Sequence, residues 1–573
     1  QGTITVIAGE VPTDEIDDSD NGEDVDLDDE LDNIDEENVD SETFIAPPPD
    51  LLEVLETVDQ PTDEAGADTA SSGDDGRVAL SSAERDQNAA LTDPLDIPLD
   101  FTAVTLSETA ANSNLQATEQ ALIGEFSEFL GVEPQPEVSI PEVRSLLQNI
   151  ETATGVKPAL IYAQFRPTAT TTATGSESPE PRSLRNLAAG ANEEGQLLGS
   201  DEAGDLNPES VASQPLAQGS SVLRDSSEDV LEILLVTADG EPKLVTVRGV
   251  TRGIATLKVK QLRVVLTIPV FRQSFQFLSI SQELYGWFVE PLQGELEEQG
   301  IDNLTFVLGP GLRGLPLAAL HDGEQFVIEN FSVGLMPSLS LTNTKYQNIK
   351  EAPVLALGAS EFVSLNPLPA VPQELQLVTQ ERQPGQTFLN EAFTASTLKS
   401  ARSTAETPIV HLATHAEFLP GKASDSFIQL WGQERVTLDR LDELQLNLPA
   451  VDLLVLSACR TAVGDASAEL GFAGLAVASG GKTAIASLWY VSDRGTLGFM
   501  GEFYRQLREA PIKAEALRQT QLAMMRGEVR VENGQMVGSF GAIALPVELI
   551  DSGAPDFQHP YFWSAFTSVG SPW

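Results

Sequence analysis

Cysteine is nearly absent from this chain, since Cys459 is the only one among 573 residues. A lone thiol excludes an intramolecular disulfide and a cysteine-rich zinc site. Two interpretations of Cys459 remain: a small buried apolar side chain, or a nucleophile. A single cysteine is compatible with either an oxidising or a reducing compartment.

Basic residues are also scarce. The chain has 33 Lys and Arg against 87 Asp and Glu, a net charge of −54, and residues 1–76 contain no Lys or Arg but 27 Asp and Glu. Because a nucleic-acid partner requires clustered basic side chains to neutralise phosphate, we expect none. The acidic run 14–40 should be solvated, disordered and extended by self-repulsion.

Long apolar runs are missing as well. No run of about 18 apolar residues is present, so we predict no membrane span. The chain begins with Gln1 rather than Met, which we interpret as a processed or truncated start from which any signal segment is gone. The acidic, disulfide-free composition favours an extracellular or cell-surface location, with the cytoplasm as the alternative.

The N-terminal segment 1–11 alternates β-branched and small residues and is predicted to be a short strand. An isolated strand is unstable alone, so we expect it to belong to a missing upstream domain or to pair with another subunit. In the second case, residues 2–8 would join copies of this chain into a homopolymer. A disordered end is the third interpretation.

Metal and nucleotide signatures are not convincing. The acidic run 17–22 departs from the EF-hand frame at Val25 and Asp28, so solvated disorder is favoured over calcium binding. Residues 309–311 form a predicted turn, and 480–483 lacks the glycine spacing of a phosphate loop. We therefore expect no cofactor and no metal.

The remaining sequence predicts an α/β fold. Continuous apolar strands separated by helices indicate a mostly parallel sheet covered by helices on both faces. A hairpin at 230–247, turning at Ala238-Asp239-Gly240, should extend this sheet by pairing with a strand at 158–165. The predicted helices are 118–130, 140–154, 280–298, 395–404, 468–479, 494–508 and 512–526, and the further strands are 304–308, 325–336, 354–358, 408–414, 453–458 and 483–489.

The predicted organisation has five parts. A long low-complexity insertion rich in Thr, Ser, Glu and Gly interrupts the folded region. The parts are a strand at 1–11, an acidic linker at 12–102, helices and a first strand at 103–166, the insertion at 167–228, and the main domain at 229–573.

Two of the predicted strands end in reactive side chains. His415 ends the apolar run from 409, and Cys459 ends the apolar run from 453. In an open parallel sheet, reactive groups gather at the carboxyl ends of strands, where an imidazole can activate a thiol. The backbone N–H groups of Cys459 and Ala416 are candidate oxyanion donors, and His411, earlier in its strand, is expected to be a core or hydrogen-bonding residue.

Six motifs stand in order along the second half of the chain: GPGLRGLPLAALHDG (309–323), LMPSLSL (335–341), VHLATHAEF (410–418), LLVLSACRTAVGD (453–465), GFAGLAVASGGKTAIASLWYVSD (471–493) and HPYFWSAFTSVGSPW (559–573). In these motifs the chain resembles the CHAT domain, a caspase-like peptidase family related to separase. The resemblance covers about 103–166 and 228–573, and the segments 524–539 and 559–563 are most similar to cyanobacterial members.

The resemblance implies a caspase-like fold with His415 and Cys459 as the catalytic dyad. This chain departs from the family pattern at Ala416, where Gly is usual, and at Arg460, where Glu or Gln is common. If position 416 required a positive φ, alanine there would cost about 1 kcal/mol. Neither departure removes His415 or Cys459, but both lie next to the dyad and are expected to affect the rate of catalytic turnover.

By likeness to separases, Asp493 would line a pocket for a basic P1 side chain. The alternative is that Asp493 caps the following helix. Glu417 and Asp425 are further acidic candidates for that pocket.

Three functions are therefore open. The first is a cysteine endopeptidase acting on a protein or peptide substrate. The second is a secreted structural, filament-forming or adhesive protein that uses the caspase-like fold as a building block. The third is a signalling scaffold that binds partners without cutting them.

Overall fold

The computed structural model describes residues 100–133, 136–167, 229–272, 274–382, 384–404, 407–461, 465–550 and 556–573. The strands are β1 (Asp100–Thr105), β2 (Pro158–Pro167), β3 (Asp229–Thr237), β4 (Lys243–Arg248), β5 (Asn303–Leu308), β6 (Ser332–Leu335), β7 (Val354–Gly358), β8 (Gln386–Leu389), β9 (Ile409–Phe418), β10 (Phe427–Gln429), β11 (Arg435–Thr437), β12 (Leu453–Thr461), β13 (Thr483–Ser487), β14 (Arg530–Glu532), β15 (Gln535–Gly538), β16 (Gly541–Ala544) and β17 (Phe566–Gly570). The α-helices are α3 (Glu108–Leu130), α4 (Ile140–Thr154), α5 (Arg252–Thr267), α6 (Gln276–Phe288), α7 (Gln293–Gln299), α8 (Val327–Asn330), α9 (Val371–Glu381), α10 (Ala395–Thr404), α11 (Ala466–Ala473), α12 (Leu475–Ser479), α13 (Asp493–Gln506), α14 (Lys513–Met525) and α15 (Pro560–Trp563).

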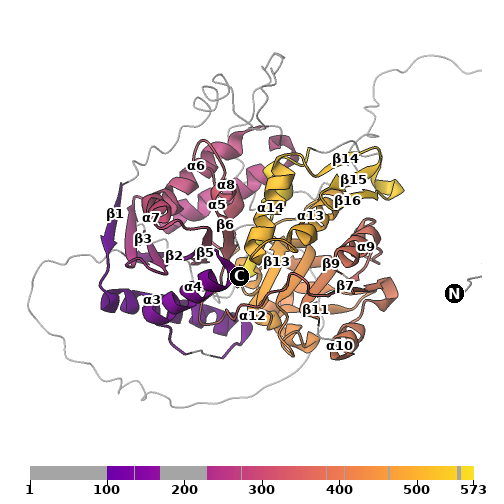
Figure 1. Cartoon of the computed structure of the whole chain (residues 1–573), viewed down its shortest axis with the longest axis horizontal. Coiled ribbons are helices and arrows are strands. Elements are labelled where there is room, and N and C mark those ends of the chain that lie inside the picture. Colours follow the sequence, from indigo (N-terminus) through magenta and orange to yellow (C-terminus); the bar gives the residue numbers. More distant parts are fainter. Residues whose placement is uncertain are drawn as a thin grey trace, which may run out of the picture. The chain divides into compact units, whose positions relative to one another are not determined.

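Within the described residues, one sheet of 14 strands forms the centre of the molecule (Figure 1). Its strands follow the order β1-β4-β3-β2-β5-β6-β17-β13-β12-β9-β10-β11; β7 also pairs with β9, and β8 pairs with β7. Two parallel blocks, β2-β5-β6-β17 and β13-β12-β9-β7-β8, meet where β17 runs antiparallel to β13. The predicted α/β fold with a largely parallel sheet and a hairpin extension, here β3-β4, is confirmed.

The alternation of side chains along β2 shows how helices cover both faces of the block β2-β5-β6-β17. Leu160 and Tyr162 pack into a core shared with α3 and α4, whereas Ala159 and Ile161 pack into the core that contains α5 and α6. Successive strand side chains point to opposite faces, so the helices lie on both sides of this strand. Burying an aliphatic side chain such as Leu160 contributes about 2 kcal/mol.

Local signals determine the ends of α4, whose predicted bounds 140–154 are confirmed. Ser139 and Glu142 form a capping box, with the Ser139 N–H donating to Glu142 at 2.8 Å. Gly155 follows in the left-handed conformation, with φ 74°, which a glycine adopts without steric cost.

Several helix predictions need correction. The predicted helix 280–298 is divided into α6 and α7 by a 3-10 turn over Glu290–Leu292 that contains Pro291, since proline cannot continue the hydrogen-bond ladder. The predicted helix 468–479 is divided at Gly474 into α11 and α12. Helices α5 and α9 are absent from the sequence interpretation.

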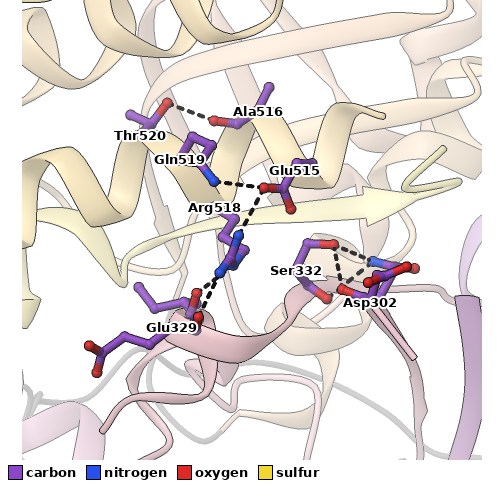
Figure 2. A network of polar contacts seen from close by, with 10 residues as sticks. Asp302, Glu329, Ser332, Glu515, Ala516, Arg518, Gln519 and Thr520 are labelled. Carbon is purple, nitrogen blue, oxygen red and sulfur yellow. Dashed lines mark hydrogen bonds and ion pairs between the residues drawn. The ribbon is translucent and has the colours of Figure 1, made fainter. Parts of the chain in front are cut away.

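The predicted strand 325–336 is also wrong over most of its length. The helical turn α8 occupies Val327–Asn330, and only β6 is extended. Arg518 of α14 donates to the carbonyl oxygens of Ile328 at 2.5 Å and Glu329 at 2.6 Å, and pairs with Glu515 (Figure 2). The hydrogen-bond donor for the carbonyl oxygens of this turn therefore comes from α14, a helix far along the chain.

The predictions for the N-terminal strand, the acidic arm, its calcium binding and most of the insertion at 167–228 lie outside the described residues. The structure does show where the insertion leaves the sheet, because Pro167 is directly opposite Asp229 in the β2-β3 pair.

Candidate functional site

The two residues predicted to form a dyad lie on neighbouring parallel strands. His415 is near the carboxyl end of β9, and Cys459 is near the carboxyl end of β12. The backbone of Cys459 is directly opposite Ala416, the residue that follows His415. The described part of Cys459 is its backbone, so the predicted distance from sulfur to imidazole stays a prediction.

A β-bulge interrupts the pairing of these strands at the candidate site. Ser457 is opposite Ala413, whereas Cys459 is opposite Ala416, so β9 uses two residues where β12 uses one. The extra residue lies in the pair formed by Thr414 and His415. Bulges bend a strand and re-aim its side chains, and they are frequent next to active sites.

The His415 imidazole is half-buried and fixed by a preceding loop, 359–370. Its Nε2 lies 2.9 Å from the carbonyl oxygen of Asn366, and its ring packs edge-on against Phe362 with centroids 4.7 Å apart. Because a carbonyl only accepts hydrogen bonds, Nε2 carries the hydrogen and Nδ1 remains free to accept a proton.

Burial lowers the pKa of His415 below its usual value of 6.5. The hydrogen bond to Asn366 and the negative charge of Glu417 oppose this effect, but burial is the largest cause. The imidazole is therefore neutral at neutral pH, the form that a general base requires.

Asp493 lies at the start of α13, and its carboxylate accepts a hydrogen bond from the Ala370 N–H at 2.6 Å. Ala370 ends the loop that contacts His415 and precedes α9. The alternative role of Asp493 as a helix cap is wrong, because Ser492 caps α13 by accepting from the Gly495 N–H. Asp493 joins the starts of two helices, and its role as a P1-binding residue stays a prediction.

The other two acidic candidates differ in their surroundings. Glu417 is partly exposed on β9, opposite Arg460 on one side and Phe427 on the other. Asp425 accepts from the Lys422 N–H at 2.7 Å within a short local turn. Of the two, Glu417 is the one whose charge acts on His415.

Ala416 carries no left-handed strain. Among the described residues, the non-glycine positions with positive φ are Asn390, Gln445 and Asn533. Alanine at position 416 therefore does not carry the energetic cost of a positive φ. Ala416 has ladder neighbours on both sides, Cys459 and Ile428. An N–H used in the ladder cannot also bind an oxyanion, so its donor role stays a prediction.

Behind the site, His411 is fully buried and hydrogen-bonded, as expected for this position. Its Nδ1 lies 3.1 Å from the Tyr504 hydroxyl, and its Nε2 lies 2.9 Å from Glu374 of α9. Burial raises the pKa of Tyr504 well above its usual value, so the hydroxyl keeps its proton and donates to Nδ1. The network ties β9 to α9 and α13.

Sequence reasoning missed Phe362 and Asn366. Asn366 acts through its backbone carbonyl, which leaves no trace in the residue type. Phe362 is an isolated aromatic residue in a loop, and such residues gain meaning only from the fold. Within the described part of the chain, no cluster of three or more His, Cys, Asp or Glu side chains could hold a metal ion. No helix there combines the length and apolar character needed to cross a membrane.

Comparisons with known proteins complete the description. The family model of the CHAT domain matches residues 278–571. No curated protein matches the chain. A separase–securin complex from Saccharomyces cerevisiae is similar over 81% of this chain and 34% of its own, with 9% identity and a TM-score of 0.41, so this chain spans about a third of that one. The Arg-specific cysteine proteinase gingipain R is similar over 51% of this chain and 67% of its own, with 13% identity and a TM-score of 0.31. A complex of the Porphyromonas gingivalis RgpB pro- and mature domains is similar over 51% of this chain and 69% of its own, with 10% identity and a TM-score of 0.30.

Proposed function

Since this chain belongs to the CHAT domain family, we propose that it is a caspase-like cysteine peptidase that cleaves peptide bonds with Cys459 and His415. The observation that carries the proposal is the environment of His415. The imidazole is neutral, keeps its hydrogen on Nε2 so that Nδ1 can accept a proton, and lies one residue from the backbone position opposite Cys459. A base held in one tautomer beside a thiol is what nucleophilic catalysis by cysteine needs.

The proposed reaction has two steps. In the first, His415 Nδ1 takes the thiol proton, the sulfur attacks the carbonyl carbon, and the C–N bond breaks as His415 returns that proton to the leaving amine. In the second, His415 takes a proton from water, the hydroxide attacks the thioester, and the C–S bond breaks to give a carboxylic acid and the free thiol. The Cys459 N–H would stabilise the oxyanion in both steps, and the Ala416 N–H would join it where the bulge leaves that group outside the ladder.

The acidic surroundings favour a substrate with Lys or Arg before the cleaved bond. Glu417 is two residues from His415, and Asp493 is tied to the loop that contacts it. Two carboxylates beside the site would attract a basic side chain and repel an acidic one.

A peptidyl acyloxymethyl ketone with Arg at P1 tests the proposal. Because Cys459 is the only cysteine, one added mass on the intact protein identifies the labelled residue. We expect labelling of the parent chain, none in Cys459→Ala, and labelling about 100-fold slower in His415→Ala. Cleavage within 167–228 during storage, abolished in Cys459→Ala, would give independent support.

His321→Asn is the matched control, because His321 lies beside Phe326 rather than in the site. It should label at the parent rate. Labelling of the folded parent no faster than of the urea-unfolded chain would overturn the peptidase proposal and leave a non-cleaving scaffold.

A second candidate function rests on β1. All six residues of β1 are exposed, and in the described chain its one strand partner is β4. An exposed edge strand is a template for another strand. Residues 2–8 of another copy would fit this edge and build an extracellular or cell-surface homopolymer.

Deleting residues 1–10 should then convert assemblies into monomers in analytical ultracentrifugation. Monomeric parent chain, or assembly unchanged by the deletion, would exclude strand donation.

A further inference from the structure

Three segments that lie far apart in the sequence converge on Gly314, in the loop after β5. A Cβ atom on Gly314 would lie 2.7 Å from Oε1 of Glu469 in α11 and 2.8 Å from Nη1 of Arg263 in α5. The Gly314 N–H also donates to the Glu469 carboxylate. A side chain at position 314 would therefore displace the Glu469 carboxylate or the Arg263 guanidinium, both of which are buried.

The groups that meet at Gly314 are charged and buried. Arg263 is 0% exposed and Glu469 is 2% exposed. Arg313, the residue before Gly314, is also buried and adds a second positive charge that acts on Glu469. Burial raises the pKa of Glu469, whereas the positive charges of Arg263, Arg313 and Lys260 and the hydrogen bond from the Gly314 N–H favour its ionised form, so the charge of Glu469 depends on these neighbours.

Both sides of the candidate site connect to this cluster. Helix α11 is the first described element after the strand that carries Cys459, and it packs against β9 and β12. Arg263 Nη2 donates at 2.8 Å to the carbonyl oxygen of Leu488, which begins the segment leading from β13 to Asp493. The Arg263 guanidinium therefore bonds to the chain before Asp493 and lies beside Gly314 together with Glu469 of α11.

We propose that Arg263 and Glu469 are positioning residues that fix α11, the helix that follows the Cys459 strand, so that His415 can activate the thiol. The inference rests on the proposed function and extends it to residues outside the dyad. A misplacement of about 1 Å at a reacting group can reduce a rate roughly 100-fold, so a buried pair that fixes one helix can affect the thiol without touching substrate.

Alkylation of Cys459 by iodoacetamide, followed from pH 5 to 9, tests this inference without a substrate. Glu469→Gln and the double variant Arg263→Met/Glu469→Met should slow alkylation at pH 7 about tenfold and move the midpoint of the pH profile upward. The double variant separates positioning from folding, since replacing two buried opposite charges together by apolar side chains often leaves stability unchanged. Arg263→Lys keeps the positive charge beside Glu469 but should retain only part of the parent rate, because lysine lacks the planar guanidinium that bonds to Leu488.

Matched variants serve as controls. Glu119→Gln removes another buried carboxylate, one that is bonded to Ser338 and Tyr162 away from the site, and should leave alkylation unchanged. Gly314→Ala should reproduce the slow alkylation, whereas Gly124→Ala, where a Cβ meets nothing within 4 Å, should not.

The outcomes distinguish the two proposals. If His415→Ala slows alkylation but Glu469→Gln and the double variant stay within twofold of the parent, positioning by this pair is excluded and the peptidase proposal stands. If His415→Ala leaves the pH profile unchanged, both proposals are overturned.

Discussion

Two different contacts of His415 control its protonation state and its tautomer. Packing against Phe362 removes water from the ring and favours the neutral form, while the Asn366 carbonyl determines which nitrogen keeps its hydrogen. Either contact alone would leave the protonation or the tautomer of this proposed base undetermined. The loop 359–370 is thus as important to the candidate site as the strand that carries His415.

Removing the Phe362 ring should shift the pH dependence of labelling. Burial lowers the pKa of His415, so Phe362→Ala should raise this pKa toward 6.5 and move the acid limb of the labelling rate to higher pH. The His415 imidazole signal in an NMR titration and the pH profile of probe labelling measure the same shift. Val363→Ala, at a neighbouring side chain that is 75% exposed, should change neither. An acid limb that stays in place in Phe362→Ala would show that this ring does not control the base.

At the residue scale, the sequence predicted what strand position alone determines. His415 and Cys459 end apolar runs, and parallel pairing brings their strand ends together. The bulge could not be predicted, because it depends on how β9 fits β12 and β10 at once. The Ser492 cap was mistaken for Asp493 because both residue types cap helices well and the two are adjacent.

At the scale of secondary-structure elements, Asp493 joins α13 to the start of α9. Asp493→Ala should lower the free energy of unfolding by about 1 kcal/mol, because the Ala370 N–H loses its acceptor. Asp493→Asn keeps an acceptor oxygen and should retain most of that stability. Urea unfolding measures both variants.

The same two variants test P1 recognition. If Asp493 binds a basic P1 side chain, Asp493→Asn should lose preference for an Arg probe over a Leu probe while remaining stable. Unchanged preference in Asp493→Asn would assign the residue to the helix contact alone, and would leave Glu417 as the remaining candidate.

Lys513, in the first turn of α14, should make stability depend on pH. It is buried against the Trp573 carbonyl, and burial lowers its pKa to about 7, from 10.5. Between pH values of about 7 and 10.5, Lys513 carries a proton in the unfolded chain but not in the folded chain. The contribution of Lys513 to stability therefore increases with pH in this range. From pH 7 to 9 this contribution should rise by roughly 1 kcal/mol per pH unit. Lys513→Met should flatten the curve in urea titrations, and an equal slope in parent and variant would contradict the assignment.

Element predictions succeeded where the signal was local. The capping box and Gly155 defined α4, and the Ala238-Asp239-Gly240 turn defined the β3-β4 hairpin. They failed where a distant partner decides the structure. Arg518 supports α8 from α14, and α5, rich in β-branched residues that disfavour helix, is stabilised by its buried face.

At the scale of the whole molecule, the insertion leaves the sheet and returns at adjacent positions. Pro167 is opposite Asp229, and the pairing is supported by an Arg166–Glu232 ion pair of 3.0 Å. Replacing residues 168–228 by a four-residue Gly-Asn turn should preserve the fold and raise the free energy of unfolding by up to about 2 kcal/mol, because a shorter loop costs less entropy to close.

Urea unfolding and probe labelling of Cys459 check the shortened chain together. Loss of labelling with stability intact would show that the insertion takes part in the site. Loss of stability would show that it takes part in the fold.

The overall architecture was predictable because buried parallel strands have an unmistakable composition. The order of the strands was not, since β17 is short and pairs with strands from both blocks. Its antiparallel entry between β6 and β13 is a property of the assembled sheet rather than of any segment.

The position of β17 has a consequence for the timing of biosynthesis. It is the last strand in chain order, yet it lies in the middle of the sheet, between β6 and β13. A growing chain therefore carries two half-sheets with open inner edges until residues 566–570 have left the ribosome. Such edges are sites of aggregation. A messenger truncated shortly before this strand would yield a chain with nearly every candidate site residue but no closed sheet, and we expect such a chain to aggregate rather than to fold with reduced stability.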